Sequence, residues 1–84
     1  MARRHETTLS FIYSSERHAQ LVDDALGPEV GEIDDDRSGA TVERDGEAVR
    51  VRVVADDLVA LRAGINSWSR LVAVTEQVID ASGR

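Results

Sequence analysis

Few side chains in this sequence could take part in catalysis. The 84 residues include no cysteine and two histidines, His5 and His18. The lack of cysteine excludes disulfides and thiolate metal sites. His5 lies near the N-terminus and His18 near the start of an expected helix, so both are expected to be surface residues without a role in catalysis. No serine lies in a nucleophile elbow and no glycine-rich loop could hold a phosphate. The sequence therefore predicts a protein that is not an enzyme and binds no cofactor.

A run of carboxylates, Asp34-Asp35-Asp36, could bind a hard cation through oxygen. The run lacks the spaced ligands and the closing glutamate of a calcium-binding loop. We therefore interpret residues 29–38 as a solvated acidic loop, and expect no metal site there.

The charge balance limits the classes of partner. Sixteen acidic residues against ten basic ones give a net charge of −6, and all ten basic residues are arginine. An acidic, lysine-free surface fits a high-salt cytosol, but a GC-rich genome would favour arginine codons equally well. The negative net charge argues against strong independent binding to nucleic-acid backbones. A local basic face remains compatible with this net charge.

The chain length predicts one domain, residues 1–84, because two separate cores would not fit. No internal repeat or linker interrupts it. No apolar run approaches the ~18 residues that span a bilayer, and the N-terminus does not resemble a signal peptide. We therefore expect a cytoplasmic protein with no membrane partner.

The N-terminal half predicts a strand followed by a helix. Apolar and polar residues alternate from Thr7 to Tyr13, which is typical of a strand with one buried face. Ser14 and Ser15 could cap a helix that reaches Leu26, and Gly27-Pro28 would end it, because glycine tolerates the C-cap geometry and proline cannot continue a helix. The expected buried stripe of this helix is Ala19, Val22, Ala25 and Leu26, with Leu21 at its margin.

The middle of the chain predicts a β-hairpin from residue 39 to residue 54. We expect the turn at Asp45-Gly46, because Asp-Gly favours a type I′ turn, which needs a positive φ at two positions. This turn would pair Val42 with Val49, Ala40 with Val51 and Thr41 with Arg50, giving one apolar and one polar face. Three arginines are assigned to the open, polar face as a candidate tRNA-binding or dimer surface: Arg44, Arg50 and Arg52.

The longest predicted element is a helix from Asp57 to Ser82 with two apolar stripes. The stripe expected against the sheet comprises Leu58, Leu61, Ile65, Trp68, Val72, Thr75 and Ile79. The second comprises Ala60, Ala63, Gly64, Ser67, Leu71, Val74 and Val78. One small sheet cannot cover both stripes, so the second predicts a partner site.

Together these elements predict an α+β fold: a three-stranded antiparallel sheet with two helices on one face, in the order β-α-β-β-α. Small residues in the second stripe would let the backbone of a partner helix approach closely. The sequence alone thus favours a protein that binds other proteins.

The residues from Asp57 to Leu71, DLVALRAGINSWSRL, follow a strand that ends in Ala55-Asp56. They resemble the pattern Leu-x-Ala-Leu-Arg-Ala-x-x-Asn-Ser-x-x-Arg of the small dimerisation subunit of the KEOPS tRNA threonylcarbamoyladenosine complex (Pcc/CTAG family). With the lysine-free composition, the resemblance implies a subunit from a halophilic archaeon. Two positions depart from the family pattern: Gly64, where a bulkier residue is common, and Ser69, where an apolar residue is usual.

The resemblance implies a non-catalytic subunit. Members of the family pair with a copy of themselves and dock their helices on the threonylcarbamoyl transferase subunit, and the complex modifies the adenosine beside the anticodon of certain tRNAs. The resemblance places Arg62, Asn66, Ser67 and Arg70 at the transferase-facing surface, to which the second apolar stripe adds Ala63, Gly64, Leu71 and Val74. Trp68 is expected in the core, and tRNA is expected to bind weakly or only within the complex.

Several alternatives stay open. The dimer surface is expected at an exposed edge strand or at the polar sheet face, since the helices are assigned to the transferase. The sheet-face arginines could instead pair with nearby acids on a solvated surface. The chain could also be a diverged paralogue of the small subunit that forms heterodimers with it, because such a paralogue would have the same sequence pattern. A small RNA-binding module is the alternative from another class, although its stacking aromatics would be limited to Phe11, Tyr13 and Trp68.

Overall fold

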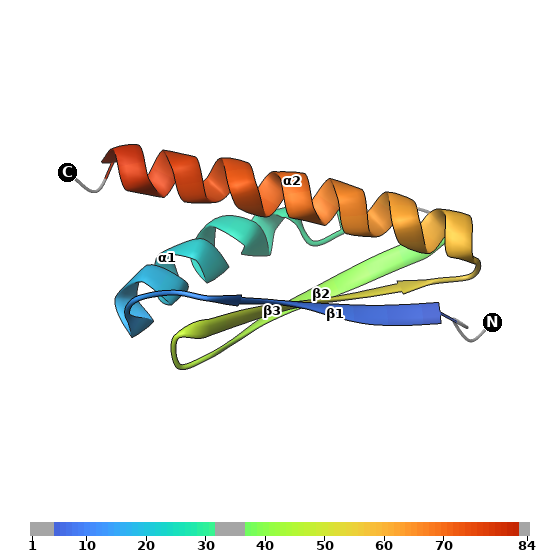
Figure 1. Cartoon of the computed structure of the whole chain (residues 1–84), viewed down its shortest axis with the longest axis horizontal. Coiled ribbons are helices and arrows are strands. Elements are labelled where there is room, and N and C mark those ends of the chain that lie inside the picture. Colours follow the sequence, from blue (N-terminus) through green and yellow to red (C-terminus); the bar gives the residue numbers. More distant parts are fainter. Residues whose placement is uncertain (1–4, 32–36, 83–84) are drawn as a thin grey trace.

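The computed structural model describes residues 5–31 and 37–82. Three strands form an antiparallel sheet in the order β1-β3-β2, and both helices cover one face of it (Figure 1). This confirms the predicted α+β fold, while the acidic run Asp34–Asp36 lies outside the described residues. The elements are β1 (His5–Ile12), α1 (Glu16–Leu26), the 3-10 turn η1 (Gly27–Glu29), β2 (Ser38–Asp45), β3 (Ala48–Ala55) and α2 (Leu58–Ser82).

The hairpin turn differs from the predicted one. Asp45 pairs with Ala48, so the two-residue loop is Gly46-Glu47. Gly46 has a φ of 62°, and no non-glycine residue of the described ranges has a positive φ. A type I′ turn at Asp45-Gly46 would have forced Asp45 to a positive φ, whereas a type II′ turn needs it only at its first residue, here a glycine. The predicted register is therefore wrong by two residues, which leaves each side chain on the same face.

The first helix begins and ends as predicted. Ser15 has an extended φ of −154°, and its hydroxyl oxygen accepts a hydrogen bond from the backbone N–H of His18 at 3.0 Å. The helix ends at Leu26 with Gly27 as its C-cap, as predicted, and with a φ of −50° at Gly27 the chain continues into the short 3-10 turn η1. A left-handed φ of 91° occurs at Gly31. Ala25 is exposed, so the buried stripe is limited to Ala19, Val22 and Leu26.

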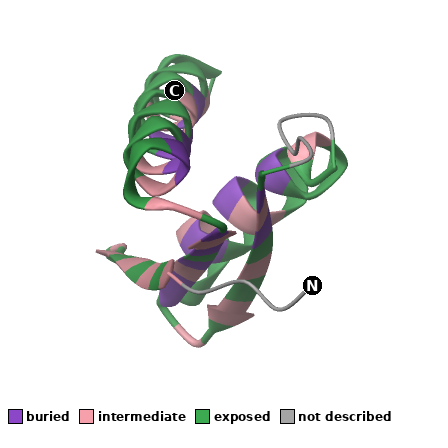
Figure 2. Ribbon diagram, turned by 90° about the vertical axis from the view of Figure 1, so that its right-hand side faces the viewer, coloured by how far each residue is buried: buried purple, intermediate pink, exposed green. Residues whose placement is uncertain are grey.

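The core lies between the two helices and the central strand (Figure 2). Val49, Val51 and Val53 of β3 are at most 1% exposed, because β3 has a strand on each side and a helix above it. The only tryptophan, Trp68, is 1% exposed, which confirms its expected place in the core. Hydrophobic burial of this cluster is the main stabilising contribution to such a small domain.

The buried side of α2 lies between the two predicted stripes. Leu58, predicted to face the sheet, is 63% exposed. Ala60 and Gly64, predicted to face a partner, are buried. The physical reason is the contact at Gly64, where a Cβ atom would lie 2.8 Å from Cγ1 of Val53. Glycine at this point lets α2 approach β3 more closely than any side chain would allow, and this sets the rotation of the helix. The buried residues of α2 are Ala60, Gly64, Trp68, Val72 and Thr75.

The start of α2 is fixed by Asp57. Its Oδ1 accepts a hydrogen bond from the backbone N–H of Ala60 at 2.8 Å, and its Oδ2 accepts one from Nη2 of Arg37 at 2.6 Å. These two donors hold the pKa of Asp57 below its usual value, so the carboxylate stays charged beside the positive end of the helix. Although α2 is long, neither it nor α1 is apolar enough to cross a membrane over the described part of the chain.

Candidate protein-binding surfaces

The outward side of α2 holds most of the residues predicted to bind a partner. Residues three and four apart share one side of a helix, so these residues form a continuous strip. We call this strip the α2 outer face. It combines small and apolar side chains with two arginines, a composition that suits contact with another protein. Its exposed members are Arg62, Ala63, Asn66, Ser67, Arg70 and Val74.

Two residues assigned to the partner site have another role. Gly64 is buried against Val53, so it cannot contact a partner and its assignment to the docking surface is wrong. Leu71 is only partly exposed and packs against the core cluster. Both lie on the side of α2 that turns towards the sheet, because the close approach at Gly64 rotates the helix away from the predicted orientation.

Other exposed apolar residues extend the outer face beyond the predicted set. Val59 is 72% exposed and lies in the first turn of α2, and Val78 is 58% exposed in its last turns. Near the C-terminal end, Leu21 of α1 and Val78 line a shallow groove between the two helices together with Ile79 and Arg17. The sequence could not predict this groove, because tertiary contacts decide how two helices cross. Its only indication was Leu21, which was expected at the margin of the buried stripe of α1.

The open face of the sheet is polar. Arg50 and Arg52 line a shallow hollow with Thr8, Thr41 and Glu43. Both arginines have acidic neighbours: Nη1 of Arg50 lies 3.4 Å from Oδ2 of Asp45, and Arg52 pairs with Glu6. Exposed pairs of this kind add little stability. They do reduce the positive charge that a phosphate group would meet at this face.

Arg44 does not lie on the open face. It is two residues from Val42 on β2, and alternate residues of a strand point to the same side, so both face the helices. Its Nη1 donates a hydrogen bond to the carbonyl oxygen of Gly46 at 3.1 Å, and its side chain lines a groove with Glu16 and Arg17 of α1. The predicted grouping of Arg44 with Arg50 and Arg52 is therefore wrong.

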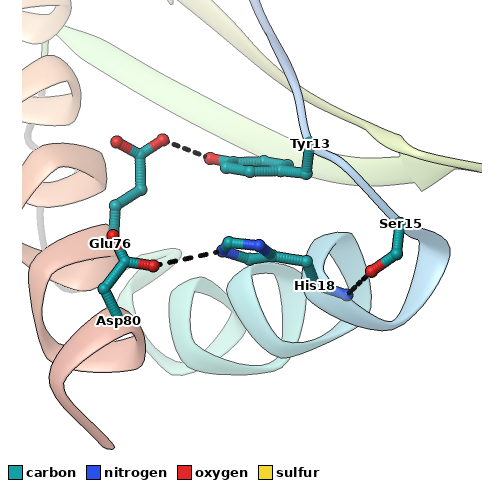
Figure 3. Close-up of polar contacts among 5 residues, drawn as sticks. All are labelled: Tyr13, Ser15, His18, Glu76 and Asp80. Atoms are coloured by element: carbon teal, nitrogen blue, oxygen red, sulfur yellow. Dashed lines mark hydrogen bonds and ion pairs between the residues drawn. The ribbon is translucent and has the colours of Figure 1, made fainter. Parts of the chain in front are cut away.

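A polar cluster joins three elements at one end of the molecule (Figure 3). The hydroxyl of Tyr13, just after β1, donates a hydrogen bond to Oε2 of Glu76 on α2 at 2.6 Å. The ring of His18 on α1 stacks on the ring of Tyr13 with 5.0 Å between centroids, and its Nε2 lies 3.8 Å from Oδ1 of Asp80. His18 is therefore half-buried between two elements, and its expected place on the surface is corrected. The cluster fixes the last turns of α2 against α1 and β1.

The cluster predicts an alkaline transition. Burial and the carboxylate of Glu76 raise the pKa of Tyr13 above its ordinary value of about 10. The folded state then binds the phenol proton more tightly than the unfolded state, so stability is full below about pH 10 and falls as the pH rises further. The chain has one tyrosine and neither lysine nor cysteine, so few other groups titrate in this range.

We expect tyrosinate absorbance to appear at higher pH in the folded protein than in urea. We also expect the urea midpoint to fall as the pH rises above about 10, and Tyr13→Phe to remove this fall. A tyrosinate titration that is the same in folded and unfolded chains would contradict the Tyr13–Glu76 contact.

Comparison with known proteins identifies the family. The family model described as "Transcription factor Pcc1" matches residues 6–80, which extend from β1 into the last turns of α2. The chain belongs to the Pcc1 family. This agrees with the KEOPS small-subunit resemblance of the segment from Asp57 to Leu71, which lies inside the matched range.

A solved structure supports the same fold. A chain in the crystal structure of the binary complex Gon7-Pcc1 superimposes on this Pcc1-family chain with a TM-score of 0.83. The match covers 95% of this chain and 98% of that chain, with 18% sequence identity. At that identity the likeness establishes a shared fold. No curated protein matches the chain.

Among residues 5–31 and 37–82, no group of three or more histidine or acidic side chains could hold a metal ion. The clustered carboxylates, Glu76 and Asp80, are occupied by Tyr13 and His18. The described surfaces, the α2 outer face among them, offer contacts to a macromolecule.

Proposed function

We propose that this Pcc1-family chain is a non-catalytic, cytoplasmic subunit of the KEOPS complex. In this role it pairs with a second copy and binds the threonylcarbamoyl transferase subunit, and so supports threonylcarbamoyladenosine modification of tRNA. The observation that supports the proposal is the α2 outer face: a 25-residue helix buries one side on the sheet and leaves small and apolar residues exposed along the other.

The outer face suits a partner helix. Ala63 and Ser67 lie one turn apart and have short side chains, so a second helix could approach α2 closely there. Val59 and Val74 lie further along the same helix and would lose their exposed apolar area to the partner. Arg62 and Arg70 at the rim could pair with carboxylates of the transferase, which would favour a correct orientation more than it would add affinity.

The RNA-binding alternative has less support. Single-stranded RNA is recognised by bases that stack on exposed aromatic side chains. Phe11 and Trp68 belong to the helix-covered core, and the ring of Tyr13 is stacked on His18. The open face is left with Arg50 and Arg52, whose charges are balanced by Asp45 and Glu6. In the proposed role, tRNA contacts at this face are weak and depend on the assembled complex.

A diverged paralogue of the small subunit would have the same fold and the same outer face. It would differ in needing the main subunit as its pairing partner. Light scattering of the purified chain separates the two roles: the main subunit is expected to be a dimer by itself, and the paralogue to pair only when mixed with the main subunit.

The docking surface is tested by enlarging one exposed small residue. Ser67→Trp is expected to weaken transferase binding by about tenfold or more, equivalent to about 1.4 kcal/mol, because the indole would hold the partner helix away from α2. Titration calorimetry with the transferase of the same organism gives the affinity. Thr41→Trp is the matched control, a similar enlargement of an exposed residue on the opposite face of the sheet. Unchanged binding by Ser67→Trp, or an equal loss by both variants, would exclude the outer face as the docking site.

A further inference from the structure

We propose that Tyr13 is a positioning residue for transferase docking: its hydrogen bond to Glu76 holds the last turns of α2 in the place where the partner binds them. This inference rests on the proposed function and adds to it a residue that lies beneath α2 and not on its outer face. It is supported by the length of α2 relative to the sheet, by the exposure of its last turns, and by the polar cluster below them.

α2 is longer than the sheet that supports it. Its 25 residues extend over about 37 Å, whereas the eight residues of β3 extend over about 26 Å. α2 begins just after the end of β3 and runs back along the sheet, so roughly its last seven residues project beyond the strands (Figure 1). We call residues 76–82 the α2 overhang.

The α2 overhang has little apolar support. All of its residues belong to the described part of the chain and none of them is buried, so Thr75 is the last buried residue of α2. Ile79 packs against the core cluster, while Val78 is 58% exposed. A helix end with few buried contacts opens locally at a low cost in free energy. The position of the overhang therefore depends on its polar contacts.

Two side chains below the overhang contact its carboxylates (Figure 3). The hydroxyl of Tyr13 donates a hydrogen bond to Oε2 of Glu76 at 2.6 Å. Nε2 of His18 lies 3.8 Å from Oδ1 of Asp80, beyond hydrogen-bonding distance, and has no hydrogen-bond partner in the described part of the chain. A hydrogen bond to a charged acceptor is among the stronger polar contacts of a protein. Of these two contacts, the one from Tyr13 is therefore the stronger anchor.

Tyr13 is itself held in place without help from α2. Its backbone N–H donates to the carbonyl oxygen of Glu47 in the hairpin turn at 2.9 Å. Its ring stacks on the ring of His18 in α1, with 5.0 Å between the ring centroids. The hydroxyl of Tyr13 thus projects from the junction of β1 and α1 as a fixed point to which α2 is attached.

The overhang contains the C-terminal part of the proposed docking surface. Val78 lies one turn after Val74 of the α2 outer face, so both lie on one side of the helix. Val78 and Ile79 also form one wall of the groove whose other wall is formed by Arg17 and Leu21 of α1. An overhang that moves away from α1 changes both features. The apparent affinity for a partner falls in proportion to the fraction of molecules that keep the binding-competent arrangement.

Tyr13→Phe tests the anchor, because it keeps the ring that stacks on His18 and removes only the hydroxyl. The half-buried carboxylate of Glu76 would then lack its donor, and the overhang would restore the hydration of this group by moving away from residue 13. We expect the affinity for the transferase of the same organism, measured by titration calorimetry, to fall about fivefold, the factor that corresponds to one net hydrogen bond. We also expect amide hydrogen exchange in residues 77–82 to become faster.

Glu76 supplies the matched variants. Glu76→Gln keeps an acceptor for the hydroxyl of Tyr13, so we expect its affinity to stay within about twofold of the natural chain. Glu76→Ala removes the acceptor and is expected to weaken binding as much as Tyr13→Phe does. The double variant should show no further loss, because both changes remove the same contact.

Val42→Ala controls for a general loss of stability. Val42 is a partly buried residue of β2 that packs against the core cluster, so shortening it should lower the urea midpoint. It lies outside the polar cluster, and we expect both transferase affinity and amide exchange in residues 77–82 to stay unchanged.

The outcomes separate this inference from the function on which it rests. Natural affinity in Tyr13→Phe, or an equal loss of binding in Val42→Ala, would overturn the positioning role and leave transferase docking in place. A further loss in the double variant of Tyr13 and Glu76 would mean that Glu76 contacts the partner directly, which also overturns the role. A natural chain that does not bind the transferase removes the docking part of the proposed function, and this inference with it.

Discussion

Replacing Gly64 with leucine is expected to lower the free energy of unfolding by about 1–3 kcal/mol, the usual range for an overpacked core. A Cβ atom at this position would lie 2.8 Å from Cγ1 of Val53, so something must shift, and Val53 is itself a core residue that is 1% exposed. Helix propensity alone predicts the opposite sign, since glycine costs about 1 kcal/mol relative to alanine inside a helix. The sign of the change therefore distinguishes close packing from propensity.

Urea denaturation, monitored through the fluorescence of the single tryptophan, measures this change in the free energy of unfolding. Ala63→Leu is the matched control, because Ala63 is the preceding residue and is exposed. It is expected to leave the urea midpoint nearly unchanged, within about 0.5 kcal/mol. A Gly64→Leu protein as stable as the natural chain would mean that α2 lies further from β3 than described. Any loss of transferase binding by this variant would follow from the damaged fold, since Gly64 does not reach the outer face.

Local rules predicted the elements of the fold correctly. Alternation from Thr7 to Tyr13 predicted β1, and Ser15, one of the two serines proposed as caps, predicted the start of α1. Each of these features depends on a few neighbouring residues, so the sequence contains the necessary information. The turn was misplaced for a similarly local reason. Gly46 could occupy either central position of the turn, and the requirement that Asp45 keep a negative φ decided between them.

Tertiary features were harder to predict. The two apolar stripes of α2 had similar composition, and the sheet covers residues from both because Gly64 allows close approach at one point. No pattern in the sequence fixes that rotation. The outer face was nevertheless largely predicted, since Arg62, Asn66 and Ser67 are exposed as expected. The polar cluster of Tyr13, His18, Glu76 and Asp80 was missed, because its members come from three elements whose crossing is set by the same contact.

The exposed surfaces of the chain differ in their chemistry. The α2 outer face has small and apolar residues exposed along one side of a 25-residue helix. The open sheet face has paired charges, which are well solvated and offer little driving force for association.

The largest loss of stability is expected from Trp68→Ala, about 3–5 kcal/mol for removing a buried large aromatic side chain. Trp68 is the largest fully buried side chain of the described residues, and its contacts join α2 to the core cluster. Small domains have a total stability near the lower end of about 5–15 kcal/mol, so this variant should be close to unfolded at room temperature. Far-UV circular dichroism during urea denaturation measures the change without the tryptophan signal.

Leu58→Ala is the informative comparison for Trp68→Ala, because both positions belonged to the stripe predicted to face the sheet. Leu58 is 63% exposed, so truncating it removes little buried area and should cost less than about 1 kcal/mol. If Leu58→Ala destabilised the chain as much as Trp68→Ala, α2 would be rotated towards the originally predicted orientation, and Gly64 would turn back towards the partner. Equal stability of Leu58→Ala and the natural chain, with a large loss in Trp68→Ala, would establish the rotation that exposes the α2 outer face.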